Sequence, residues 1–197
     1  MDPLLIVEGC DFQSFPVGGQ LTKVKHYMRC LPGVVDLVGV TSDKERVGRW
    51  SNLEIEGKTY ALFGTRYISD PTRKPLIPRR ITFLLSTLFH ARAIRARSSR
   101  GALAVSPEGA LAIHFLKLPK CLYESSGVGN PLLGSRYRGA GLFAKLFERV
   151  LFAVLRGWPI ITAAADDREI QRWVDRSKGQ LSFLRVHQSF TSFDSTV

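Results

Sequence analysis

Residues 4–40 read LLIVEGCDFQSFPVGGQLTKVKHYMRCLPGVVDLVGV, and this stretch decides the fold. The apolar run at 4–7 predicts a buried strand. Apolar side chains recur at helical spacing over 20–31, and Pro32 with Gly33 ends that helix. The apolar run at 34–40 predicts a second strand. A strand, a glycine-containing loop, a helix and a strand in this order form a βαβ unit, whose two strands pair in parallel.

The alternation of strands and helices continues along the rest of the chain. Residues 51–68 predict a β-hairpin with Gly57 in its turn. Hydrophobic periodicity predicts helices at 79–98, 110–116, 142–156 and 166–177, and strands at 101–105, 121–123, 160–164 and 183–187. We therefore expect an α/β fold: a Rossmann-like open, mostly parallel sheet with helices on both faces and a β-hairpin insertion.

In such a sheet, ligands bind at the carboxyl ends of the strands. The connections expected at that edge are residues 11–19, 41–49, 106–108, 124–138 and 165–167.

Length and composition favour one globular domain. The chain has 197 residues, of which 45% are hydrophobic, enough to bury one sizeable core. The three cysteines, Cys10, Cys30 and Cys121, are odd in number and widely spaced, so they predict free thiols in a reducing compartment. The sequence shows neither a signal peptide nor a run of about 20 uncharged apolar residues, and we expect a cytoplasmic protein.

The net charge of +11 is compatible with nucleic acid, an anionic membrane surface or a phosphorylated substrate as partner. No carboxylate lies between Asp70 and Glu108, whereas basic residues flank the apolar helix predicted there. This pattern predicts contact with an anionic bilayer, and a solvated basic face on a core helix is an equally good interpretation. The predicted membrane-facing residues are Arg79, Arg80, Arg92 and Arg95.

Nucleic acid is the less favoured partner of this basic segment. Phe83 and Phe89 occur at helical spacing, which suits burial better than base stacking.

The pair Gly18-Gly19, just before the first helix, is the first candidate site. Glycines allow close approach of the backbone, and a helix N-terminus offers free N–H groups to a phosphate or diphosphate. An ordinary tight turn explains the pair equally well, because neither the Walker nor the dinucleotide pattern is present. Lys23 could reach the same phosphate, although a solvated lysine is the commoner case. The loop residues Arg136 and Arg138 are candidate contacts to a phosphate or an acceptor.

Glu108, in the sequence Ser106-Pro107-Glu108 at a predicted strand end, is the second candidate. A carboxylate at this place could act as a base or bind sugar hydroxyls. It also stands near a helix start, where a negative charge is favoured, and that structural role is the simpler interpretation. The four histidines are scattered without metal-ligand spacing, so we expect no metal site and no cofactor.

The stretch 6–20, IVEGCDFQSFPVGGQ, resembles the opening of family 4 glycosyltransferases. These are retaining enzymes with two facing Rossmann-like domains, the GT-B architecture. The resemblance implies that Gly18 and Gly19 approach the diphosphate of a nucleotide-sugar donor. Residues 105–108 occupy the position at the end of a strand where many family members carry a histidine of the catalytic site. Residues 142–165 resemble the late helix and strand of the family's first domain. Residues 190–197 are similar to the segment that enters the second domain.

By this resemblance, residues 1–189 form the N-terminal, acceptor-side domain and residues 190–197 begin the interdomain linker, with the donor-binding domain absent. The family's histidine at the strand end is not found, and Glu108 replaces it only by position. The implied substrates are a nucleoside diphosphate sugar and a polysaccharide or lipid-linked acceptor, with catalysis at the inner face of a membrane. The donor half would come from a separate chain or a homo-oligomer. A nonenzymatic nucleotide- or nucleic-acid-binding module is the alternative from another class.

Overall fold

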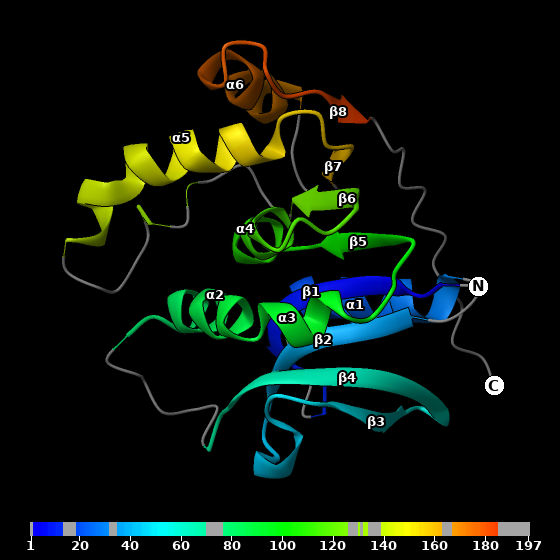
Figure 1. Cartoon of the computed structure of the whole chain (residues 1–197). Coiled ribbons are helices and arrows are strands. Elements are labelled where there is room, and N and C mark those ends of the chain that lie inside the picture. Colours follow the sequence, from blue (N-terminus) through cyan, green and yellow to red (C-terminus); the bar gives the residue numbers. More distant parts are fainter. Residues whose placement is uncertain are drawn as a thin grey trace.

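A single open sheet forms the centre of the molecule (Figure 1). The computed structural model describes residues 2–13, 19–31, 35–69, 77–125, 130, 132–133, 139–162 and 167–184. Within this part, eight strands pair in the order β3-β4-β2-β1-β5-β6-β7-β8, and every pair is parallel except the antiparallel pair β3–β4. The expected α/β fold with an open, mostly parallel sheet is confirmed.

The βαβ unit predicted from residues 4–40 is present. It consists of β1 (Leu4–Asp11), α1 (Gly19–Cys30) and β2 (Val35–Thr41), with Leu4 opposite Val35 in the parallel register. Both strands are almost wholly buried, which explains why they have continuous apolar runs without alternation.

The predicted hairpin extends one end of the sheet. It pairs β3 (Trp50–Ile55) with β4 (Lys58–Tyr67), and β4 also pairs in parallel with β2. Glu56 and Gly57 form the two-residue turn with φ angles of 51° and 73°. Two successive positive φ angles define the turn type that fits the twist of a hairpin, and glycine adopts them without strain.

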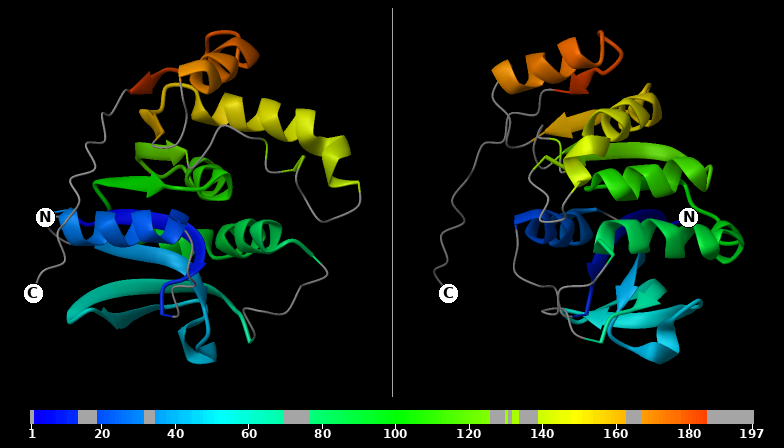
Figure 2. Two further views of the ribbon diagram at one scale, coloured as in Figure 1. Left: turned by 180° about the vertical axis from the view of Figure 1, so that it is seen from behind. Right: turned by 90° about the vertical axis from the view of Figure 1, so that its left-hand side faces the viewer.

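Helices cover both faces of the sheet (Figures 1 and 2). On one face lie α2 (Arg79–Phe89), α3 (Ala91–Arg95), α4 (Pro107–Phe115) and α5 (Ala144–Leu155), preceded by the short helix η2 (Ala140–Phe143). Buried residues of these helices, such as Phe83, Ile94 and Ile113, form one core with the sheet. The helix α1 covers the other face through Val24 and Met28, which belong to a second core.

The remaining strands complete the sheet. They are β5 (Gly101–Ala104), β6 (Lys120–Ser125), β7 (Ile160–Thr162) and β8 (Phe183–Leu184). The helix α6 (Asp167–Arg176) follows β7 and packs Trp173 against Phe152 of α5, with a distance of 5.5 Å between the ring centroids.

Two predictions about helix boundaries are wrong. The single helix expected over 79–98 is two helices, α2 and α3, which meet at His90 with φ −91° and ψ 16°. This break lets Ile94 reach the core, where it is fully buried. The expected loop at 106–108 is the cap and first turn of α4, because the Ser106 side chain accepts a hydrogen bond from the backbone N–H of Gly109.

Within the described ranges, no helix is both long enough and apolar enough to cross a membrane.

Candidate functional site

Buried polar side chains gather at the carboxyl ends of the neighbouring strands β1, β5 and β6. We call the four buried residues Glu8, Ser106, Glu108 and Tyr123, together with the half-exposed Arg80 of α2, the carboxylate cluster. Its two carboxylates are buried, with Glu8 5% exposed and Glu108 8% exposed. Charged side chains are almost never buried to this degree without a partner or a role. The cluster lies at the edge where open α/β sheets bind their ligands.

The start of α4 brings Glu108 beside Glu8. Ser106 is the N-cap, Pro107 is the first helical residue, and Glu108 stands in the first turn, where the helix dipole favours a negative charge. Gly109 follows directly against β1, and a Cβ atom on it would overlap the carbonyl oxygen of Val7. The close contact between this helix and this strand therefore sets the spacing of the two carboxylates.

The two carboxylates share one positively charged neighbour. Arg80 Nε lies 3.4 Å from Oε1 of Glu108, and the arginine side chain is half exposed. Burial raises the pKa of Glu8 to about 8, and the negative charge of Glu108 adds to the shift, whereas a hydrogen bond with Ser106 opposes it. Burial also raises the pKa of Glu108, and Arg80 opposes that shift. Near neutral pH we therefore expect Glu8 to be protonated, with Arg80 favouring the charged form of Glu108.

The cluster offers hydrogen-bonding groups of both kinds to a ligand. Oε2 of Glu8 is buried and has no hydrogen-bond partner in the structure. Burial also raises the pKa of Tyr123, so its hydroxyl stays neutral. A protonated carboxyl and hydroxyls donate, whereas the carboxylate of Glu108 accepts. This combination suits a ligand that carries several hydroxyl groups.

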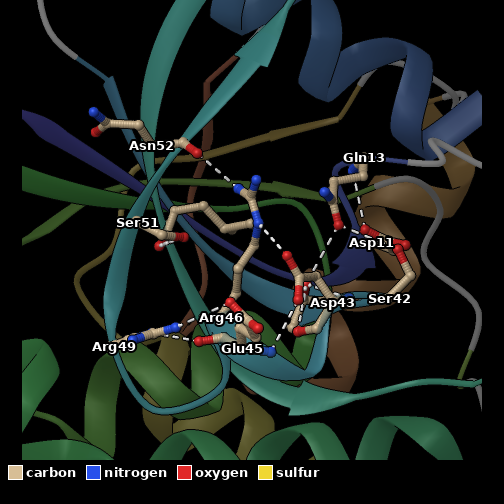
Figure 3. Close-up of polar contacts among 11 residues, drawn as sticks. Asp11, Gln13, Ser42, Asp43, Glu45, Arg46, Arg49, Ser51 and Asn52 are labelled. Atoms are coloured by element: carbon tan, nitrogen blue, oxygen red, sulfur yellow. Dashed lines mark hydrogen bonds and ion pairs between the residues drawn. The ribbon is translucent and has the colours of Figure 1, made fainter.

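A second group of polar residues connects the ends of β1 and β2 (Figure 3). Asp11 Oδ1 accepts a hydrogen bond of 3.0 Å from the backbone N–H of Gln13. Oε1 of Gln13 in turn accepts hydrogen bonds from Ser42 Oγ at 3.1 Å and from Thr41 Oγ1 at 3.4 Å. These contacts join the two loops that the sequence analysis places at the ligand-binding edge.

The loop after β2 is held by its own contacts (Figure 3). Asp43 caps the short helix η1 (Lys44–Arg46) by accepting from the backbone N–H of Glu45 at 2.9 Å. Arg46 binds Asp43 with Nε at 3.1 Å and donates from Nη1 to the carbonyl of Asn52 at 2.7 Å. The hydrogen bond from the Glu45 backbone, followed by the one from Arg46, lowers the pKa of Asp43. A ligand at this edge would therefore meet a loop that is already ordered.

The sequence-predicted site residues fall into four groups. Glu108 lies in the carboxylate cluster, together with Arg80, whose role was expected to be membrane contact. Gly19 is the first residue of α1, and Lys23 lies further along that helix, with its side chain outside the described part. Arg92 and Arg95 are exposed and Arg79 is half-exposed. Outside the described residues lie Gly18, Arg136 and Arg138.

Glu8 and Tyr123 are the members of the cluster that sequence reasoning missed. The sequence analysis ended the first strand at Val7 and treated Glu8 as a boundary, whereas β1 continues to Asp11. The available signal was that apolar residues recur after Glu8, at Cys10 and Phe12, and both of them are buried. Among the described residues, no group of three or more His, Cys, Asp or Glu side chains could hold a metal ion.

Comparison with known proteins identifies the fold. No protein-family model and no curated protein matches the sequence. Among solved structures, the chain is similar to sucrose-phosphate synthase from Thermosynechococcus elongatus, with a TM-score of 0.62 and 16% sequence identity. The match covers 93% of this chain and 47% of the synthase, so the chain spans about half the length of that protein. The chain thus has a glycosyltransferase-like Rossmann fold.

Proposed function

We propose that this chain is the acceptor-side half of a glycosyltransferase that moves a sugar from a nucleoside diphosphate sugar to an acceptor. The observation that carries the proposal is the carboxylate cluster at the carboxyl edge of a sheet that matches about half of a sucrose-phosphate synthase. The resemblance of residues 6–20 to family 4 supports a retaining enzyme of the GT-B type.

In this proposal the donor diphosphate lies at the start of α1. Backbone N–H groups at Gly18 and Gly19 and the positive end of the helix dipole would stabilise the negative charge that develops on the leaving group. Lys23, Arg136 and Arg138 are the proposed further contacts to phosphate or acceptor. The reaction needs neither a divalent metal nor a cofactor in this scheme.

The carboxylate cluster would bind the acceptor. Glu108 is the proposed base, since Arg80 lies 3.4 Å from its carboxylate and opposes the rise that burial gives its pKa. Glu8, as the protonated partner, would donate a hydrogen bond from its buried carboxyl to an acceptor oxygen. Ser106 and Tyr123 are neutral neighbours that would complete the hydrogen bonding of a sugar.

The proposal assigns residues 1–189 to the acceptor-side domain and residues 190–197 to the start of an interdomain linker. The donor-binding half would be part of a longer polypeptide that includes this chain, a separate protein or a second copy of this chain. A polysaccharide or a lipid-linked sugar is the proposed acceptor, and the exposed basic helices favour a cytoplasmic enzyme that is peripheral to the inner face of a membrane.

A thermal-shift panel tests this function. The panel contains nucleoside diphosphate sugars, hexose phosphates, oligosaccharides and duplex DNA. We expect at least one sugar ligand to raise the melting temperature of the purified chain, because a ligand that binds only the folded state stabilises it. Glu108→Gln should weaken that ligand's affinity about tenfold to a hundredfold, as loss of a hydrogen bond to a charged group does.

Glu54→Gln, an exposed substitution on β3, is the matched control and should leave the affinity unchanged. If duplex DNA were the one ligand that stabilises the chain, and its binding weakened steeply with rising salt, the result would support a nucleic-acid-binding module and contradict the transferase proposal.

A further inference from the structure

The outer face of α2 carries a row of exposed apolar side chains. Ile77, Ile81, Leu85 and Phe89 follow one another at intervals of four residues, and they are 54%, 48%, 59% and 85% exposed. Residues four apart lie on the same side of a helix, so Ile81, Leu85 and Phe89 form one continuous row on α2, and Ile77 stands just before the helix, next to its N-cap Pro78. The inner face of the same helix packs Phe83 into the core, where it is 1% exposed.

A second row lies on η2 and α5. Leu142, Leu146 and Val150 are again spaced by four residues and are 85%, 59% and 38% exposed, and Phe143 beside them is 62% exposed. The helix α4 packs against both α2 and α5, and all three helices lie on the same face of the sheet (Figures 1 and 2). We call these two rows the apolar rows.

The charges around the apolar rows are positive. Arg92 and Arg95 are exposed beyond the end of α2, and Lys145, Arg149 and Arg156 are exposed along and after α5. No carboxylate occurs in residues 71–107, and Glu148 is the one carboxylate in residues 139–162. Glu148 is not available to an external cation, because it forms an ion pair with Arg176 and accepts a hydrogen bond from Asn130.

We propose that the apolar rows are a membrane-binding face, which seats the protein on a bilayer that contains anionic phospholipids. Apolar side chains would enter the boundary between headgroups and acyl chains, and the surrounding cations would bind lipid phosphates. Nucleic acid is a poorer partner for this face, because its phosphates would bind the cations but leave the exposed leucines and phenylalanines in contact with water. A second copy of the chain would bring cations against cations, at a net charge of +11 on each molecule.

The location of this face agrees with a membrane-bound acceptor. The helix η2 and the first turn of α5 lie on the side of the molecule toward which β5 and β6 point (Figure 1), which is also the side of the carboxylate cluster. This face deepens the membrane location that belongs to the proposed function, but it rests on exposure and charge, so vesicle binding can fail or succeed independently of sugar transfer.

Sedimentation with lipid vesicles tests the proposal. Wild-type protein is mixed with vesicles of phosphatidylcholine alone, or of phosphatidylcholine with 30% phosphatidylglycerol as an approximate anionic content of a membrane. We expect binding to the anionic vesicles and much weaker binding to the neutral ones. The double variant Phe89→Asp, Leu142→Asp should lose at least about tenfold in vesicle affinity, since two apolar anchors become negative charges. The double variant Arg92→Ala, Arg95→Ala should lose roughly twenty-five-fold in vesicle affinity, at about fivefold for each cation.

Two controls make the result specific. Leu184→Asp changes an apolar side chain that is 55% exposed on β8, outside the apolar rows, and should leave vesicle affinity unchanged. The melting temperature of every variant should stay close to that of the wild type, because all of the replaced side chains are exposed. Absence of binding to anionic vesicles would overturn the proposal, as would unchanged binding by the Phe89→Asp, Leu142→Asp variant. A wild-type dimer that this variant dissociates, without vesicle binding, would assign the face to self-association instead.

Discussion

Replacement of Gly109 by alanine is expected to lower the free energy of unfolding by about 3 kcal/mol, the upper range for overpacking in a core. The added Cβ atom would overlap the carbonyl oxygen of Val7, a backbone atom of the fully buried strand β1. It would also lie 3.2 Å from Ser106 Oγ, the atom that caps α4. The carbonyl oxygen of Val7 is a backbone atom and cannot rotate out of the way, so the helix itself must move away from the strand.

Denaturant unfolding monitored by circular dichroism measures this effect. Gly141→Ala is the matched control, since a Cβ atom at Gly141 has no neighbour within 4 Å, and it should change stability by less than about 0.5 kcal/mol. Equal stability of the two variants would contradict the close contact between α4 and β1. Because this contact sets the spacing of Glu8 and Glu108, Gly109→Ala should also weaken any ligand that binds the carboxylate cluster.

Glu8→Gln is expected to stabilise the protein increasingly as the pH rises. Below about pH 4.5, the ordinary pKa of a glutamate carboxyl, Glu8 is protonated in both the folded and the unfolded state. Above that pH the unfolded chain releases the proton, whereas the folded protein keeps it until about pH 8, where burial and Glu108 place the pKa of Glu8. The unfolded state then binds fewer protons than the folded state, so the wild-type free energy of unfolding falls with rising pH.

The stability difference between Glu8→Gln and the wild type should therefore grow by about 3 kcal/mol from pH 5 to pH 8. Urea unfolding of both proteins at four pH values across this window measures it. Glu54→Gln, on the exposed side of β3, should give a difference that does not depend on pH. A pH-independent difference for Glu8→Gln as well would show that Glu8 ionises normally in the folded protein.

Local sequence signals were sufficient for much of the fold. The apolar runs before and after the first helix are buried strands, and such runs without alternation are typical of parallel sheets covered on both faces. Gly57 marked the hairpin turn correctly, because few other residues adopt its φ of 73° without strain. The sequence could not reveal the break at His90, since apolar residues keep helical spacing on both sides of it and tertiary packing of Ile94 determines the new direction.

The candidate site was only partly predictable. Glu108 could be found because its position after a strand and at a helix start has a clear sequence signature. Glu8 and Arg80 could not be assigned to the same site, because the pairing of β1 with β5 and the packing of α2 beside α4 bring them together from distant parts of the sequence. The predicted roles of Gly18, Arg136 and Arg138 stay predictions, as these residues lie outside the described part of the chain.

The central claim is that a sugar ligand binds at the carboxyl edge of the sheet, and chemical-shift mapping by NMR tests it most directly. The isotope-labelled chain is titrated with the sugar ligand that gives the largest thermal shift. We expect the perturbed backbone amides to lie in residues 8–13, 41–46, 106–110 and 123–125, with affinity reduced at least about tenfold by Glu108→Gln. The contrary result would be perturbation confined to the opposite edge, where Met28, Asp36, Lys58 and Arg97 line a cavity of about 630 Å³.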